Sequence, residues 1–163
     1  MHPSCQQLMR DFVEKYLSPL RELKHPLTII DIGSYNVNGT FKSQFNEENW
    51  KYIGIDIRKG ENVDIVLEDP YKYPFDNNSI DVIISGNTFE HIEYPWKAFE
   101  EINRVIKPGG LICIIVPSFG GKHDDFDAWR ILPDGMKSLC KWSNLSVIET
   151  FISQRDTWWQ DVS

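Results

Sequence analysis

The feature that most constrains the fold of this chain is a series of short apolar segments, each closed by a turn-forming or polar residue. Six of them are rich in Ile, Val and Leu and predict buried strands at residues 27–33, 51–56, 63–67, 80–85, 111–117 and 145–152. Strands that are buried on both faces and alternate with crossover connections favour a parallel sheet covered by helices. The sequence therefore predicts an α/β fold with a doubly wound, mostly parallel sheet in a three-layer sandwich.

Helical spacing of apolar residues appears in the connections between these strands. It predicts an amphipathic helix over 4–17, a second over 94–106 that ends at the KPGG sequence of 107–110, and a short one from Pro133. Pro19 and Pro26 predict a connector after the first helix. A chain of 163 residues fits one domain. Its parts are an N-terminal helix (1–20), a core (27–118), and a final unit of loop, helix and last strand (119–163).

Composition limits the partners and the compartment. The net charge of −7 disfavours nucleic acid or an anionic membrane as the main partner, because both attract basic surfaces. The first 17 residues contain no long apolar run, so we expect neither a signal peptide nor a membrane span. Three widely spaced cysteines, with Cys113 inside a predicted strand, are typical of reduced thiols, which predicts a cytoplasmic protein.

Polar residues gather where the first two predicted strands end, and parallel sheets bind ligands at that edge. Asp31 and Gly33 close the first strand, and Asp56 closes the second. The glycine permits a tight turn, and an acidic residue at the second position can accept both hydroxyls of a ribose. Taken alone, the pattern is equally consistent with a tight turn beside a solvated carboxylate.

The longer motifs carry more information. Read together, DIGSYNVNGTF, YIGIDIRKG, VLEDPYKYPFDNNSIDVIIS, FEHIEYPWKAFEEINRVIKPGG and LICIIVPS resemble class I S-adenosylmethionine-dependent methyltransferases of the type 11 group over about residues 27–152. The resemblance implies a Rossmann-like sheet whose seventh strand is antiparallel. It also implies methyl transfer from S-adenosyl-L-methionine, with S-adenosyl-L-homocysteine as product, to an oxygen or nitrogen of a small molecule.

The same resemblance assigns cofactor contacts by position. Asp31 and Gly33 correspond to the loop around the methionine part, and Asp56, followed by Ile57, to the ribose site. The remaining assigned contacts are Asp69 and Pro70 at the adenine, and Gly86 and Asn87 at the methionine end. Tyr35 departs from the family pattern, because it stands where a second glycine is expected. Its side chain could instead cover the cofactor.

Two histidines are candidate catalytic bases. His91 is interpreted either as a base that takes a proton from the substrate or as a helix-start residue that bonds the backbone. His123 lies in the HDDFDAWR segment, where a substrate would enter. Glu90, Trp129 and Arg130 are candidate substrate-binding residues, although Trp129 could equally be core, with Arg130 covering it.

A metal site is the alternative interpretation of the acidic loop. His123, Asp124, Asp125 and Asp127 offer ligands that hard cations prefer. Adjacent aspartates point in different directions in most loops, so we expect a solvated acidic loop or a substrate clamp, and no metal.

The end of the sequence allows several interpretations of how the sheet is completed. The chain stops at TWWQDVS, where the last antiparallel strand is expected. The strand is then short, or the chain is truncated, or another subunit completes the sheet. Trp158 and Trp159 favour association, as a homodimer or within a larger parent enzyme.

Two other functions compete with an active methyltransferase. A nicotinamide-dependent oxidoreductase is disfavoured because no G-x-G-x-x-G follows the first strand. A non-catalytic or incomplete methyltransferase-like module, acting as a partner subunit, stays open because fold alone cannot separate the two.

Overall fold

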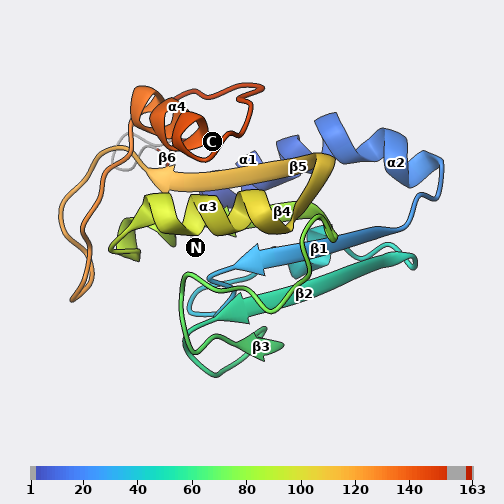
Figure 1. The fold of residues 1–163 in the computed structure, drawn as a ribbon, viewed down its shortest axis with the longest axis horizontal. Helices are drawn as coiled ribbons and strands as arrows, with labels where there is room; N and C mark the ends of the chain where they lie inside the picture. The colour runs from blue at the N-terminus through green and yellow to red at the C-terminus, as the bar shows by residue number, and fades with distance from the viewer. Residues whose placement is uncertain (1–2, 154–160, 163) are drawn as a thin grey trace.

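The computed structural model describes residues 3–153 and 161–162, and one six-stranded sheet organises them (Figure 1). The strand order is β3-β2-β1-β4-β5-β6. The strands are β1 (Leu27–Ile32), β2 (Trp50–Asp56), β3 (Ile65–Val66), β4 (Ile80–Gly86), β5 (Ile106–Pro117) and β6 (Asp161–Val162). The first five run parallel and β6 is antiparallel to β5. The predicted doubly wound, mostly parallel sheet is therefore confirmed.

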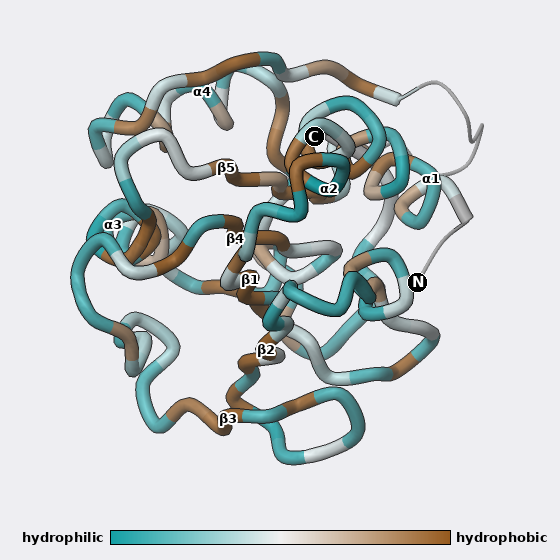
Figure 2. Tube along the Cα trace, turned by 90° about the vertical axis from the view of Figure 1, so that its right-hand side faces the viewer, coloured by the Kyte–Doolittle hydropathy of each residue, from teal (hydrophilic) through white to brown (hydrophobic). Residues whose placement is uncertain are grey.

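Helices cover both faces of the sheet, as Figure 2 shows in a view along the strands. On one face, α1 (Pro3–Phe12), a π-helical turn η1 (Val13–Leu17) and α2 (Ser18–Glu22) follow one another without a break. On the other face lie α3 (Pro95–Val105) and α4 (Pro133–Trp142). Two 3-10 turns, η2 (Lys42–Gln44) and η3 (Phe89–His91), lie within the connections. The prediction of a connector at Pro19 is wrong, because this proline lies in the first turn of α2. A backbone N–H at that position has no partner within the helix, so a proline is tolerated there.

The side chains of each strand alternate between the two faces of the sheet, and this divides the hydrophobic core into two clusters. Ile29 and Ile84 face α1 and η1 in one cluster, whereas their neighbours Ile30 and Ile83 face α3 in the other. Successive side chains of a strand point to opposite faces, so a strand covered on both sides is apolar throughout. This explains why the strand segments lack a polar face in the sequence.

Strand β5 is longer than predicted. The KPGG sequence at 107–110 belongs to it, and α3 ends directly before it at Val105. The pairing with β4 shifts register between Ile80 and Val82, and Gly109 adopts a φ of 80°, which only glycine tolerates readily. The glycines thus form an irregularity within the strand, and the expected separate turn is absent at 107–110.

The strand predicted at 145–152 is wrong. This segment is irregular apart from an isolated bridge at Ile152. Asn144, at a φ of 58°, turns the chain away from α4, and Glu149 is held at the first helices by Lys15 Nζ (2.7 Å) and Tyr16 Oη (2.9 Å). The segment therefore runs from the end of α4 to the first helices. The antiparallel strand β6 pairs with β5 at Val116 and Pro117.

Trp158 and Trp159 lie outside the described residues. Within the described part, no helix is long and apolar enough to cross a membrane.

Candidate active site at the carboxyl ends of the strands

A cavity of about 560 Å³ opens where β1, β2 and β4 end, at the left of Figure 1. Its walls come from the loops after β1, β2, β3 and β4, and from three residues of the loop after β5. The lining residues are Ile32, Gly33, Tyr35, Val37, Ile55, Asp56, Ile57, Arg58, Leu67, Pro70, Tyr71, Asn87, Thr88, His91, Ile92, Glu93, Asp124, Asp125 and Phe126. This volume lies within the range of small-molecule and cofactor sites.

Gly33 forms the tight turn that brings the backbone of the β1 loop to the cavity. Its φ is 76°, and a Cβ at this position would lie 2.1 Å from Oγ1 and 2.3 Å from Cγ2 of Thr88. The Gly33 N–H donates to the carbonyl of Ile55 (2.9 Å), which ties the turn to β2. Both the backbone conformation and the neighbouring side chain therefore require glycine here.

Asp56 holds the β1 loop in place. Its carboxylate accepts the N–H of Tyr35 at Oδ2 (3.1 Å) and the N–H of Arg58 at Oδ1 (2.8 Å). The Tyr35 ring packs on Gly60, where an added Cβ would lie 2.1 Å from the ring. Tyr35 is accommodated because the next loop has a glycine beneath it.

Asp31 lies behind the cavity and does not line it. Its side chain is buried and accepts a hydrogen bond from the hydroxyl of Tyr52. Burial raises the pKa of Asp31 to about 7, against the hydrogen bond from Tyr52, and the charge of Asp56 adds to the increase. A direct cofactor contact from Asp31 stays a prediction.

Asn87 lines the cavity just after β4. It adopts a left-handed φ of 54°, and its N–H donates to the carbonyl of Ile115 (2.8 Å). Its Oδ1 is buried and has no hydrogen-bond partner among the described residues.

On the opposite side of the cavity, Pro70 and Tyr71 form a wall. Asp69 does not line the cavity, and its Oδ1 accepts the N–H of Tyr71 (2.9 Å), which shapes the turn that presents this wall. Gly86 also lies outside the lining, one residue before Asn87. Direct contacts from Asp69 and Gly86 stay predictions.

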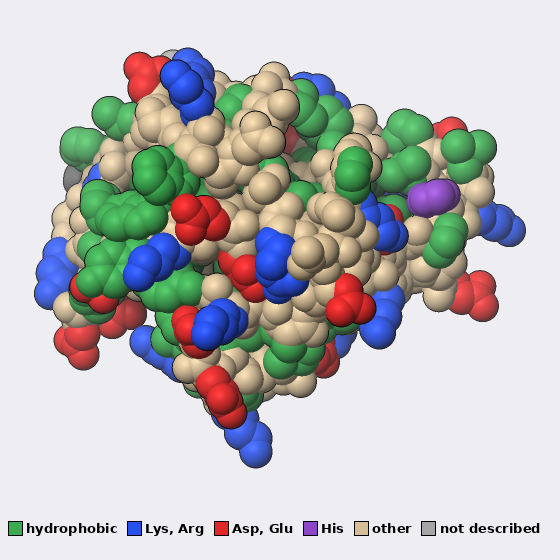
Figure 3. All heavy atoms as spheres, in the orientation of Figure 1, with side chains coloured by type: hydrophobic (Ala, Val, Ile, Leu, Met, Phe, Trp, Pro, Cys, Tyr) green, Lys and Arg blue, Asp and Glu red, His purple; other side chains and the backbone are tan. Residues whose placement is uncertain are grey.

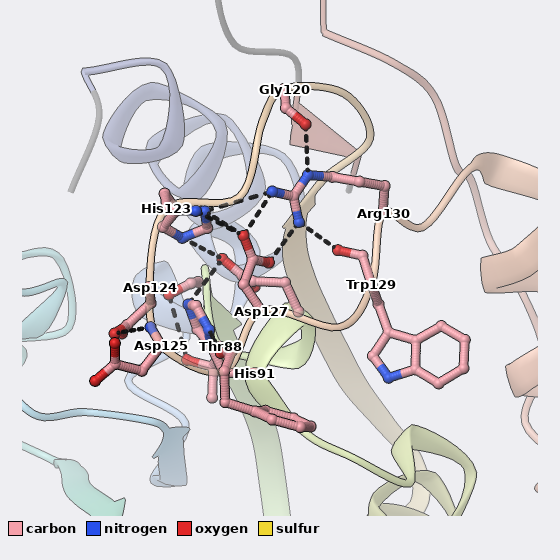
Figure 4. Close-up of polar contacts among 12 residues, drawn as sticks. Thr88, His91, Gly120, His123, Asp124, Asp125, Asp127, Trp129 and Arg130 are labelled. Carbon is pink, nitrogen blue, oxygen red and sulfur yellow. Dashed lines mark hydrogen bonds and ion pairs between the residues drawn. The ribbon is translucent and has the colours of Figure 1, made fainter.

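The loop after β5 folds back onto η3. The N–H groups of Ala128 and Trp129 donate to the carbonyl of Glu90 (2.8 and 3.3 Å). Inside the loop, Arg130 binds both carboxylate oxygens of Asp127 (2.5 and 2.7 Å) and the carbonyl of Gly120 (3.2 Å) (Figure 4). These contacts hold the pKa of Asp127 well below its usual range, with the Arg130 hydrogen bonds as the largest cause.

This folding brings the two predicted histidines together. The rings of His91 and His123 lie edge to face with centroids 4.9 Å apart. His91 Nδ1 lies 2.6 Å from the carbonyl oxygen of Phe126, and His123 Nδ1 lies 2.9 Å from Asp127 Oδ2. His91 lines the cavity and His123 lies directly behind it.

A series of aromatic rings begins at Tyr71, which lines the cavity. Tyr71, Tyr94, Trp96 and Trp129 form a continuous series of ring contacts with centroids 5.6 to 6.2 Å apart. Figure 3 shows hydrophobic side chains gathered at the left of this face, over the amino-terminal end of α3. The indole N–H of Trp129 donates to the carbonyl of Ile92 (2.9 Å), so the ring is fixed at the rim.

Comparison with known sequences decides the family. The sequence model described as "Methyltransferase domain" matches residues 15–114, which is more than half of the chain. The chain belongs to the methyltransferase-domain family. The resemblance inferred from the sequence motifs is thereby confirmed.

Individual relatives of this methyltransferase domain agree. The chain is 32% identical over 99 residues to an uncharacterized methyltransferase from Mycolicibacterium gilvum, which covers 54% of this chain and 38% of the relative. A relative from Mycobacteroides abscessus is 31% identical over 101 residues and is also covered to 38%. The match thus spans less than two fifths of the length of these curated relatives.

Solved structures show the same fold. A SAM-dependent methyltransferase from Aquifex aeolicus superposes with a TM-score of 0.64 at 19% identity, over 99% of this chain and 96% of the other. One from Archaeoglobus fulgidus gives 0.67 at 17% identity, over 91% and 73%.

Of the site residues predicted from sequence, the methyltransferase cavity collects Gly33, Tyr35, Asp56, Ile57, Pro70, Asn87 and His91. Glu90, His123, Trp129 and Arg130 lie around it without lining it. Sequence reasoning missed Thr88 and Phe126. Thr88 could have been found only from its contact with the Gly33 turn, and Phe126 contributes a backbone carbonyl, which leaves no trace in side-chain chemistry.

Proposed function

We propose that this domain binds S-adenosylmethionine in the cavity and transfers its methyl group to an oxygen, or a nitrogen, of a small molecule. The observation that carries the proposal is the position of the Asp56 carboxylate. It ends β2 and borders the same cavity as the Gly33 turn and Asn87. An acidic side chain at this strand end, next to a tight glycine turn, is the arrangement that binds a ribose in doubly wound folds.

The chemistry of the cavity fits a nucleoside. Asp56 uses one acceptor position on each carboxylate oxygen for a backbone N–H, and a carboxylate offers about four such positions. The remaining positions would accept the two ribose hydroxyls. Ile57, Leu67 and Pro70 provide apolar walls beside Asp56 that would pack on the adenine ring.

The opposite end of the cavity fits the amino acid part of the cofactor. Asn87 lines this end and would contact the amino acid part of the cofactor. Gly33 has no Cβ to separate its backbone from the ligand. Asp31 would stabilise this loop from behind through Tyr52.

The acceptor would enter between the aromatic rim and the two histidines. His91 donates its Nδ1–H to the Phe126 carbonyl in this arrangement, which leaves Nε2 as the proton-accepting atom. His123 is oriented in the same way by Asp127. Trp129 would contact the acceptor at the rim, while Arg130 and Glu90 position the loop that carries His123.

S-Adenosylmethionine, when bound, supplies an activated methyl whose C–S bond breaks as the bond to the acceptor forms. The protein would contribute mainly alignment of the acceptor with that carbon. Such positioning can lower a barrier by about 7 kcal/mol or more.

Calorimetric titration of the purified chain with S-adenosylhomocysteine tests the proposal. We expect Asp56→Ala to weaken binding by about 10- to 100-fold, because hydrogen bonds to a charged group contribute about 1.5–3 kcal/mol. Asp134→Asn, on the exposed side chain of α4, is the matched control and should bind like the wild type. Unchanged affinity in Asp56→Ala would show that the site is misplaced. A screen of hydroxylated and amino acceptors for S-adenosylhomocysteine release then tests the acceptor class.

A further inference from the structure

Three side chains on the acceptor side of the cavity bring metal-binding atoms to one point. Glu90 Oε1 lies 3.7 Å from His91 Nε2 and 3.8 Å from His123 Nε2. One potential ligand atom from each residue lies within 4.8 Å of the other two. This group differs from the acidic set His123, Asp124, Asp125 and Asp127 that the sequence suggested.

That acidic set does not converge on a cation. Asp127 is bound by Arg130 through both oxygens, and Asp124 Oδ1 accepts the N–H of Asp125 (2.7 Å). Asp127 instead lies beside His123 Nδ1, where it orients the imidazole. The loop therefore supports the cluster of Glu90, His91 and His123.

We propose that Glu90, His91 and His123 form a binding site for a divalent transition-metal cation. Two imidazoles and one carboxylate are a ligand set typical of sites that keep an open coordination position. Mg²⁺ and Ca²⁺ prefer oxygen ligands alone, so the two nitrogens favour Zn²⁺ and its neighbours.

Hydrogen bonding at the far side of each ring supports the assignment. His91 Nδ1 lies at hydrogen-bond distance from the Phe126 carbonyl, and His123 Nδ1 from the Asp127 carboxylate. An imidazole that donates from Nδ1 carries its lone pair on Nε2. Histidine ligands of metals are commonly held by such a carbonyl or carboxylate on the other nitrogen. Here both lone pairs lie on the nitrogens closest to Glu90.

The spacing and the charge suit a cation. Bonds of 2.0–2.1 Å in a tetrahedron place ligand atoms about 3.3 Å apart. The two separations from Glu90 therefore need to close by about half an ångström, and the separation between the two imidazole nitrogens, which lies within 4.8 Å, by up to about 1.5 Å. His91 and His123 are partly exposed and can adjust, whereas the Glu90 side chain is fully buried. Glu90, Asp124, Asp125 and Asp127 also outnumber the nearby guanidinium groups of Arg58 and Arg130.

The consequence for the reaction rests on the proposed function. A bound cation lowers the pKa of a hydroxyl in its open position. The site would then select acceptors that are methylated on oxygen, and the cation would replace the imidazoles of His91 and His123 as the activating group.

Metal binding is tested on the whole chain, stripped with a chelator and titrated with Zn²⁺ by calorimetry. We expect one equivalent to bind. His91→Ala, His123→Ala and Glu90→Gln should each weaken binding by at least about 100-fold, and Asp127→Asn, which removes an orienting group, by about 10- to 100-fold. The control His25→Ala removes an exposed histidine before β1 and should leave binding unchanged. Thermal unfolding of each variant without metal shows that it is folded.

Two further measurements make the result decisive. Co²⁺ in place of Zn²⁺ gives a visible absorption spectrum that reports its ligands and should change in both histidine variants. Titration of the same preparations with S-adenosylhomocysteine separates this inference from the proposed function. If the nucleoside binds and Zn²⁺ does not, or if the histidine variants bind Zn²⁺ like the wild type, the metal site is refuted and the proposed function stands. If Zn²⁺ binds and the nucleoside does not, the reverse holds.

Discussion

The substitution Gly33→Ala tests the structure at the turn on which the cavity depends. Alanine meets two obstacles there. A φ of 76° is left-handed, which costs a residue with a Cβ about 1–2 kcal/mol. The new methyl would also lie 2.1 Å from Thr88 Oγ1 and 2.7 Å from Thr88 Cβ. Overpacking of this kind costs about 1–3 kcal/mol, so we expect a total destabilisation of about 2–5 kcal/mol.

The chain offers a matched control at Gly109. Its φ of 80° is nearly the same, but an added Cβ would meet nothing within 4 Å. Gly109→Ala should therefore show only the backbone contribution of about 1–2 kcal/mol. The difference between the two variants isolates the contact with Thr88.

Equilibrium unfolding in urea gives the free energy of unfolding of both variants, provided that its dependence on urea concentration has the same slope in each. Thr88→Ala removes Oγ1 and Cγ2 and leaves Cβ, so the double variant Gly33→Ala/Thr88→Ala should recover part of the loss. We expect a coupling energy of about 0.5–3 kcal/mol in the double-mutant cycle. S-Adenosylhomocysteine binding should fall in Gly33→Ala and stay intact in Gly109→Ala. If Gly33→Ala is no less stable than Gly109→Ala, the close approach of Thr88 is wrong.

Three other predictions follow from the buried groups. The pKa of Asp31 rises from 3.8 to about 7 on folding, so its contribution to stability is fully present below pH 4 and is lost as the pH rises through 7. Relative to Asp31→Asn, the wild type should lose about 3 kcal/mol of unfolding free energy between pH 5 and pH 8. A difference between the two proteins that stays constant with pH in urea unfolding would contradict this. Burial raises the pKa of Cys113 to about 12, whereas Cys140 is only partly buried, so a thiol reagent should label Cys140 first and Cys113 only on unfolding. Arg104 donates hydrogen bonds to Glu101 and to the carbonyls of Tyr73 and Phe75, so Arg104→Ala should destabilise the domain by about 2–3 kcal/mol. Arg104→Lys should have an intermediate stability, because lysine lacks the planar guanidinium group. Equal stability of Arg104→Lys and the wild type would contradict this prediction.

The central sheet could be predicted because its strands are buried on both faces. Segments such as 27–33 and 80–85 carry apolar residues at successive positions, which favours an inner parallel strand. The same signal failed at 145–152, which is as apolar as a strand but is drawn away by the turn at Asn144 and by the contacts of Glu149 with the first helices. Apolar character predicts burial, whereas pairing depends on contacts distant in sequence.

The part of the cavity at the strand ends could also be predicted, because each residue there follows a strand. Parallel strands end at one edge, so Gly33, Asp56 and Asn87 were bound to meet. The other side depends on how the loop after β5 folds. Glu90 and His91 are separated from His123 by more than thirty residues, and they meet because two N–H groups of the loop bond the Glu90 carbonyl. Backbone hydrogen bonds of this kind do not depend on which side chains are present, so the sequence did not predict the cluster.

Tyr35 shows how the site tolerates a departure from the family pattern. A glycine at this position would let the loop approach the cofactor, and its replacement suggests at first a degenerate site. In the structure the Tyr35 ring packs on Gly60, while its N–H is held by Asp56. The space that the tyrosine needs is supplied by a glycine in the following loop, and the carboxylate that would bind the ribose also fixes the backbone. Substitution of Gly60 by a larger residue should therefore disturb the β1 loop as much as a change in that loop itself.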